Sequence, residues 1–90
     1  MKGMELKVSG HIIEKGVLGI LFGALKDKES DITDIEISAS TLKGCWKQKC
    51  PSIMTFYLVS FDDEDLKKSY QEVLELLKEN GCRLIYRKDI

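Results

Sequence analysis

Four segments of the chain alternate apolar and polar residues, a pattern that predicts half-buried strands. The first runs from Met4 to about Ile12, and the second covers residues 33–40. The third covers residues 52–61, and the fourth covers residues 82–87. Because the third segment carries apolar and aromatic groups on both faces, we predict that it lies in the middle of a sheet.

Strict alternation also predicts which residues of a strand share a face. In the first strand, Leu6 and Val8 face the core. The second strand has an apolar side made of Thr33, Ile35, Ile37 and Ala39. The fourth strand has one side made of Cys82, Leu84 and Tyr86.

Two further segments change to a helical period. The first covers residues 15–28, and its apolar face consists of Val17, Leu18, Leu21, Ala24 and Leu25. The second follows the acidic run 62–65, which suits a helix N-terminus, and Asn80-Gly81 predicts its end. Its apolar stripe consists of Leu66, Tyr70, Val73, Leu74 and Leu77.

The resulting order is β-α-β-β-α-β over a single domain of residues 1–90. With right-handed crossovers, this order closes as a four-stranded antiparallel sheet with both helices on one face, the ferredoxin-like fold of the α+β class. The other face of the sheet stays open and must meet water or a partner. We expect this open face to include Lys7, Ser9, Glu36 and Ser38.

Composition narrows the classes of function. Lys and Arg number 14 against 15 Asp and Glu, so the chain lacks the basic excess of a nucleic-acid binder. No apolar run approaches the roughly 18 residues of a membrane span. Three cysteines and an N-terminus without a long apolar stretch predict a reduced, cytoplasmic protein. A single His and few candidate acid–base groups argue against an enzyme, and we expect no cofactor.

The turn between the first strand and the first helix is the strongest candidate for a ligand site. A helix N-terminus has unpaired N–H groups and suits a carboxylate or phosphate. Gly16 lets a ligand approach the backbone closely, and His11 or Glu14 can hold a second polar group. The alternative is a plain strand-to-helix turn. The predicted ligand-binding residues are Gly10, His11, Ile12, Ile13, Glu14 and Gly16.

A glycine stripe runs along the first helix, formed by Gly16, Gly19 and Gly23. Each glycine inside a helix costs up to about 1 kcal/mol against Ala. We interpret Gly19 and Gly23 as an interface that another backbone or a ligand approaches. The alternative is that these glycines clear space for a neighbouring loop of the same chain.

The loop 42–51 carries Trp46 among lysines, together with Cys45 and Cys50. We expect Trp46 to seek cover on a partner. Nucleic-acid binding by lysines and a stacked ring is a weaker alternative. Metal or redox chemistry through Cys45 and Cys50 is another, although a zinc site needs four ligands and Cys82 is distant in sequence. We therefore predict no metal site.

Residues 8–14, Val-Ser-Gly-His-Ile-Ile-Glu, resemble the Gly-His-Ile-Ile-Asp signature of the conserved region in bifunctional lysine-ketoglutarate reductase/saccharopine dehydrogenase (LOR/SDH) type proteins and some archaeal ornithine cyclodeaminase-like enzymes. Residues 51–54 and 59–66 also resemble that region's pattern. Glu14 stands in place of the family's Asp, and Cys50 in place of an expected acid. The resemblance implies the accessory region only, without the dehydrogenase or deaminase reaction.

The fold order and the glycine-containing turn also resemble ACT domains. That resemblance implies a module that binds amino acids between paired domains and regulates enzymes. Together these features predict a non-enzymatic regulatory or oligomerisation module that dimerises and binds a small amino acid at the turn. The alternative is an interaction module that docks an enzyme partner through the open sheet face and the Trp46 loop.

Overall fold

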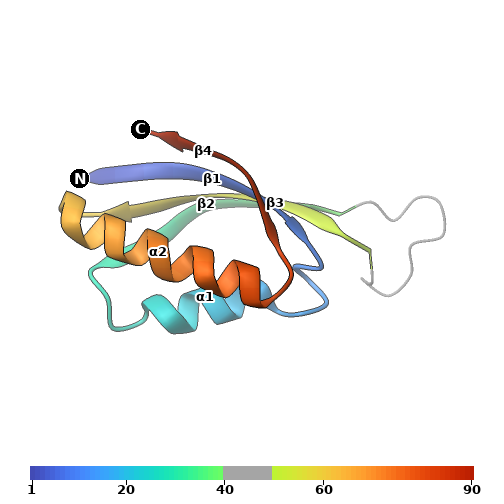
Figure 1. The fold of residues 1–90 in the computed structure, drawn as a ribbon. Helices are drawn as coiled ribbons and strands as arrows, with labels where there is room; N and C mark the ends of the chain where they lie inside the picture. Colours follow the sequence, from blue (N-terminus) through green and yellow to red (C-terminus); the bar gives the residue numbers. More distant parts are fainter. Residues whose placement is uncertain (40–49) are drawn as a thin grey trace.

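A computed structural model describes residues 1–39 and 50–90. The elements follow the predicted order β-α-β-β-α-β and confirm the ferredoxin-like fold (Figure 1). Their bounds are β1 Lys2–Gly10, α1 Val17–Leu25, β2 Ser30–Ala39, β3 Ser52–Ser60, α2 Asp63–Glu79 and β4 Arg83–Asp89. Most of the loop predicted at 42–51, including Cys45 and Trp46, lies outside the described residues.

The four strands form one antiparallel sheet in the order β2-β3-β1-β4, so β3 is central as predicted. Both helices cover the same face of the sheet, and no element of the described residues covers the other face (Figure 1). The core lies between these layers, where Leu6, Phe56, Leu21 and Val73 are fully buried. The residues of β1 and β3 that alternate with the buried ones define the middle of the open face: Glu5, Lys7, Ser9, Ile53, Thr55, Tyr57 and Val59.

Both ends of α2 are capped as the sequence predicts. Asp62 is the N-cap residue, and its Oδ1 accepts a hydrogen bond of 2.9 Å from the Asp65 N–H. At the C-terminus, the Gly81 N–H donates to the Lys78 carbonyl and the Cys82 N–H donates to the Leu77 carbonyl. These two bonds form a Schellman motif, which turns the chain sharply into β4.

A bulge in β2 corrects the faces predicted for that strand. Thr33 pairs with Tyr57 and Glu36 with Thr55, so two residues of β2 stand opposite one residue of β3. Asp34 lies within the bulge with φ 53°. The extra residue shifts the alternation, so Thr33 faces the open side, whereas the neighbouring Ile32 is a core residue.

A second bulge, in β4, corrects the face predicted for Tyr86. Val8 pairs with Leu84 and Lys7 pairs with Tyr86, which leaves Ile85 as the extra residue. Leu84 packs against the core, but Tyr86 joins the open face beside Lys7. Period-two patterns do not show such an insertion, because each half of the strand still alternates normally.

Two elements are shorter than the sequence predicts. The first strand ends at Gly10 rather than near Ile12, because Gly10 turns the chain away from the sheet. The first helix covers residues 17–25 rather than 15–28. Within the part of the chain that the structure describes, neither helix has the length and apolar character needed to cross a bilayer.

Candidate functional site

The candidate site is the turn of residues 11–16, which joins β1 to α1. It begins at Gly10, where φ is 155° and the backbone passes close to Cys82, the residue before β4. A Cβ added to Gly10 would lie 2.8 Å from the Sγ of Cys82 and 3.1 Å from its Cα. Glycine is therefore needed here for close approach as well as for its backbone angle. Gly10 serves the packing of the turn against β4.

Backbone hydrogen bonds hold the turn in one shape. The Lys15 N–H donates to the His11 carbonyl at 3.1 Å, and the Gly16 N–H donates to the Ile13 carbonyl at 3.2 Å. The Val17 N–H donates to the Ile12 carbonyl at 3.0 Å, and the Ile12 side chain is 1% exposed. Ile12 thus anchors the turn on the core, while its neighbours remain nearer to the surface.

The start of α1 leaves backbone N–H groups open. Gly16 is the N-cap residue in the left-handed conformation, with φ 60°, and no side chain caps the helix. Gly16 and Val17 use their N–H groups within the turn, whereas no described backbone carbonyl accepts from Leu18 or Gly19. Nothing lies within 4 Å of a Cβ placed on Gly16 or Gly19. Unpaired N–H groups at a helix N-terminus are the kind of donors that hold a carboxylate or phosphate in proteins.

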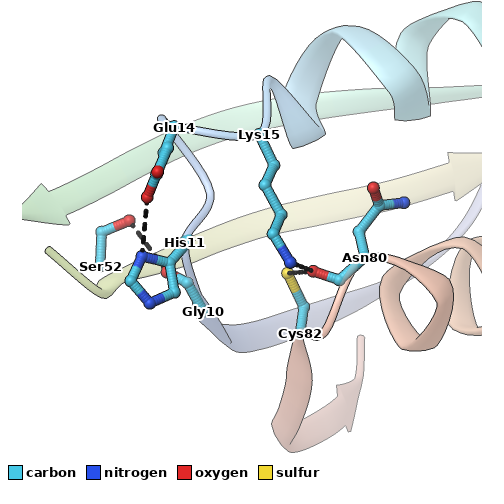
Figure 2. A network of polar contacts seen from close by, with 7 residues as sticks. All are labelled: Gly10, His11, Glu14, Lys15, Ser52, Asn80 and Cys82. Atoms are coloured by element: carbon cyan, nitrogen blue, oxygen red, sulfur yellow. Dashed lines mark hydrogen bonds and ion pairs between the residues drawn. The ribbon is translucent and has the colours of Figure 1, made fainter. Parts of the chain in front are cut away.

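His11 and Glu14 form a pair on the outer side of the turn. His11 Nδ1 lies 3.1 Å from Glu14 Oε2, and the two side chains are 42% and 44% exposed (Figure 2). The protonated Nδ1 donates this hydrogen bond. The structure therefore brings together two of the predicted site residues and keeps both within reach of solvent.

Lys15 connects the turn to α2, a contact that sequence reasoning missed. Its Nζ donates a hydrogen bond of 3.0 Å to the carbonyl of Asn80, at the C-terminal end of α2 (Figure 2). A cation at this end of a helix is favourable because of the helix dipole. Burial raises the pKa of the adjacent Cys82 thiol, and the positive charge of Lys15 opposes that shift. Lys15 and Asn80 are 65 positions apart in the sequence, so no local pattern could reveal their contact.

The predicted glycine interface faces open space. Nothing lies within 4 Å of a Cβ placed on Gly19 or Gly23, and both residues are exposed. The described residues therefore do not support the alternative that these glycines make room for a loop of the same chain. Their approach by another backbone or a ligand stays a prediction.

The described cysteines bear differently on the metal and the redox alternatives. Cys50 is disulfide-bonded, so its sulfur is not a free thiolate for a metal, and the prediction that the cysteines are reduced is wrong at this residue. Cys82 is a buried free thiol. Within residues 1–39 and 50–90, no three His, Cys, Asp or Glu side chains gather as a metal site requires.

A separate hollow lies at the other end of α1, with a volume of about 360 Å³. Phe22, Leu25 and Phe61 give it an apolar wall, and Lys26 and Lys28 stand at its rim. Phe22 and Phe61 are 41% and 75% exposed. The two ends of α1 thus differ in chemistry: backbone donors at the start and apolar surface at the end.

Comparison with known proteins identifies the fold but does not identify a family. No family model and no curated protein matches the chain. The LOR/SDH resemblance therefore stays a prediction, as does the cytoplasmic location. Among solved structures, the ACT domain of GTP pyrophosphokinase from Chlorobium tepidum matches 99% of this chain and 95% of its own length, with a TM-score of 0.54 and 8% identity.

Two larger enzymes contain a similar domain. Formyltetrahydrofolate deformylase from Burkholderia mallei matches 99% of this chain with a TM-score of 0.63 and 10% identity. A dinuclear metal binding peptidase of the M20 family from Bacillus subtilis gives a TM-score of 0.58 and 15% identity. This chain covers only 28% and 25% of their lengths. At these identities the matches show a shared ferredoxin-like fold and no more.

Proposed function

We propose that this protein is a non-enzymatic regulatory module that self-associates and binds a free amino acid at the β1–α1 turn. The observation that carries this proposal is the pair of N–H groups of Leu18 and Gly19, for which no described backbone carbonyl is an acceptor. A Cβ placed on Gly16 or Gly19, beside these groups, would meet nothing within 4 Å. The ACT-like fold supports the proposal, because the resemblance to ACT domains implies amino-acid binding and regulation.

The turn offers complementary groups to the two ends of a zwitterion. The ligand carboxylate accepts hydrogen bonds from Leu18 and Gly19 at the positive end of the α1 dipole. The ligand ammonium pairs with the carboxylate of Glu14, which is half exposed and already oriented by His11. A ligand with a basic side chain, such as lysine, arginine or ornithine, gains additional electrostatic attraction to the carboxylate of Glu14.

Binding is expected to act through Lys15. This residue lies between Glu14 and Gly16 in the turn and holds the C-terminal end of α2. A ligand that fixes the turn also fixes this link between α1 and α2. The regulatory output is thus a change in how firmly the two helices are joined, which a partner enzyme can sense.

A thermal-shift series tests the ligand half of the proposal. The panel is lysine, arginine, ornithine and neutral amino acids, together with the N-acetyl and carboxamide derivatives of each responding compound. At ten times Kd, binding contributes about 1.4 kcal/mol, which raises the Tm of a domain this size by roughly 5–10 °C. Both blocked derivatives should lose most of the shift. No shift at 10 mM of any amino acid (a concentration of about this order detects millimolar Kd values) contradicts amino-acid binding.

Two matched glycine variants locate the binding site. Side chains on a helix lean toward its N-terminus, so Gly19→Leu covers the free N–H groups of the first turn. Gly23→Leu makes the same change one turn later, and both positions face open space. Both variants should fold at least as well as the wild type, because Leu favours a helix over Gly. Only Gly19→Leu should abolish the thermal shift. Equal responses in the two variants place the ligand elsewhere.

A further inference from the structure

The open face of the sheet has its charges sorted by edge. On β2, Asp31 and Glu36 pair with the open-face residues Val59 and Thr55. Asp34 lines the same hollow as Glu36. On β4, Arg83 and Lys88 pair with Ser9 and Glu5, which also face the open side. One edge of the face is therefore acidic and the opposite edge is basic.

The centre of the open face is suited to being covered. Ile53 and Tyr86 are 40% and 38% exposed, and Tyr57 lies among them on β3. The two central charges already have local partners. Glu5 accepts a hydrogen bond from the Tyr86 hydroxyl, and the Lys7 ammonium lies 5.7 Å from the centre of the Tyr86 ring. Covering charges that are already paired costs less than covering isolated ones.

Both edges of the sheet discourage side-by-side extension by another strand. The β2 edge is interrupted between Thr33 and Glu36, and the β4 edge carries a bulge near Ile85. Bulges and charged edge residues are the features that block edge-to-edge pairing. The flat open face is thus a better place for association than either edge.

We propose that a second copy of this chain packs on the open face, with the two-fold axis running parallel to the strands. This inference rests on the self-association in the proposed function and names the surface that mediates it. An axis along the strands places β2 of each copy over β4 of the other, so acidic edges meet basic edges. An axis across the strands would place β2 over β2 and acid over acid.

The pairing of residues across the sheet then predicts which residues of the two copies lie opposite one another, because this axis keeps each residue at the same level along the strands. Glu36 lies at the level of Lys7 and Tyr86, between the levels of Arg83 and Lys88. In the second copy, those two bases flank the point that Glu36 faces. Because β3 of each copy lies over β1 of the other, Tyr57 lies over Glu5 of the second copy. Aligned sheets pack about 10 Å apart and cross at about 30°, a distance that long side chains from both copies can span.

The size of the face predicts a reversible dimer. Four strands about 4.8 Å apart and about 30 Å long give a flat area of roughly 550 Å² for each copy. The two copies together then bury about 1,100 Å², near the lower end of specific interfaces. We expect a dissociation constant in the micromolar range.

Sedimentation equilibrium of the full chain and two charge-reversed variants tests the proposal. The first variant combines Asp31→Lys with Glu36→Lys on β2, and the second combines Arg83→Glu with Lys88→Glu on β4. Each should raise the dissociation constant of its own dimer at least tenfold. A 1:1 mixture of the two variants should restore dimers, because each contact between edges then joins opposite charges. Raising the salt concentration should weaken the wild-type dimer.

A chain that carries all four reversals tests whether acid–base contacts between the edges hold the dimer together. It should dimerise as the wild type does, because every acid–base contact is exchanged rather than lost. Matched controls reverse exposed charges on α2: Glu75→Lys with Glu79→Lys, and Lys67→Glu with Lys68→Glu. These controls should leave the dimer unchanged.

The outcomes separate this inference from the wider function. A wild-type chain that stays monomeric at 1 mM and low salt (about a thousand times a micromolar Kd) overturns both the face and the self-association. A dimer that resists both charge reversals overturns the strand-parallel pairing of the two open faces, because an axis across the strands places like charges over like charges in the wild type and in both variants. A four-reversal chain that cannot dimerise overturns the acid–base pairing of the edges, and equal weakening by the α2 controls overturns the open face as the interface. None of these results depends on whether an amino acid binds at the turn.

Discussion

The junction between β1 and the candidate site should be intolerant of even one methyl group at position 10. In Gly10→Ala, the new Cβ would lie 2.8 Å from the Cys82 Sγ and 3.1 Å from the Cys82 Cα. The thiol can rotate, but the backbone cannot easily withdraw, because the Cys82 N–H donates a 2.8 Å hydrogen bond to the Leu77 carbonyl. The residue also has φ 155°, a conformation that L-residues rarely adopt.

The two costs can be estimated separately. An unfavourable backbone conformation costs about 1–3 kcal/mol, and overpacking costs about 1–3 kcal/mol. The free energy of unfolding should therefore fall by roughly 2–6 kcal/mol, out of about 5–14 kcal/mol for a domain of this length. The variant is expected to unfold at a clearly lower urea concentration than the wild type.

Urea denaturation followed by circular dichroism measures the change. Gly23→Ala is the control, because its Cβ meets nothing within 4 Å and Ala favours the helix by about 1 kcal/mol. In a Cys82→Ala background, Gly10→Ala should cost at least about 0.5 kcal/mol less, since the contact with sulfur is gone. A Gly10→Ala protein within about 0.5 kcal/mol of the wild type, the usual range of surface changes, would refute the close approach.

Three further predictions concern polar contacts. Lys15→Met removes the cation from the Asn80 carbonyl and should lower the free energy of unfolding by about 0.5–1 kcal/mol in urea; an unchanged midpoint contradicts this contact. Asp62→Ala removes the N-cap of α2 and should lower the free energy of unfolding by about 1 kcal/mol in the same assay. Asp62→Asn should retain most of the stability, because Asn is also a good N-cap residue. The hydrogen bond and charge of Glu5 raise the pKa of Tyr86 above 10.0, so its stabilising contribution is present below the unfolded-state pKa and is lost as the pH rises through the folded-state pKa. Phenolate absorbance should show Tyr86 titrating at lower pH in Glu5→Gln, and an unmoved titration is the contrary result.

The order of the elements could be predicted from the sequence because each element carries a local signal. The alternation of Leu6 and Val8, the N-cap at Asp62 and the stop at Asn80-Gly81 all depend on neighbours within a few residues. The bulges could not be predicted in this way. Ile32 and Tyr86 lie on the faces they occupy because one residue is inserted nearby, and the insertion is defined by pairing with another strand.

The candidate site was only partly predictable for the same reason. The His11–Glu14 pair joins positions three apart, and the open start of α1 follows from a glycine without a capping side chain. The contacts of Gly10 with Cys82 and of Lys15 with Asn80 cross the whole chain. The sorting of acids and bases on the open face also appears only when β2 and β4 are placed at opposite edges of the sheet.

An amide titration by nuclear magnetic resonance tests the central claim most directly. The ¹⁵N-labelled chain is titrated with the amino acid that gives the largest thermal shift. We predict saturable shifts centred on the Leu18 and Gly19 amides, with smaller changes at Glu14. Unmoved Leu18 and Gly19 signals at saturating ligand, or shifts centred on another part of the chain, would contradict it.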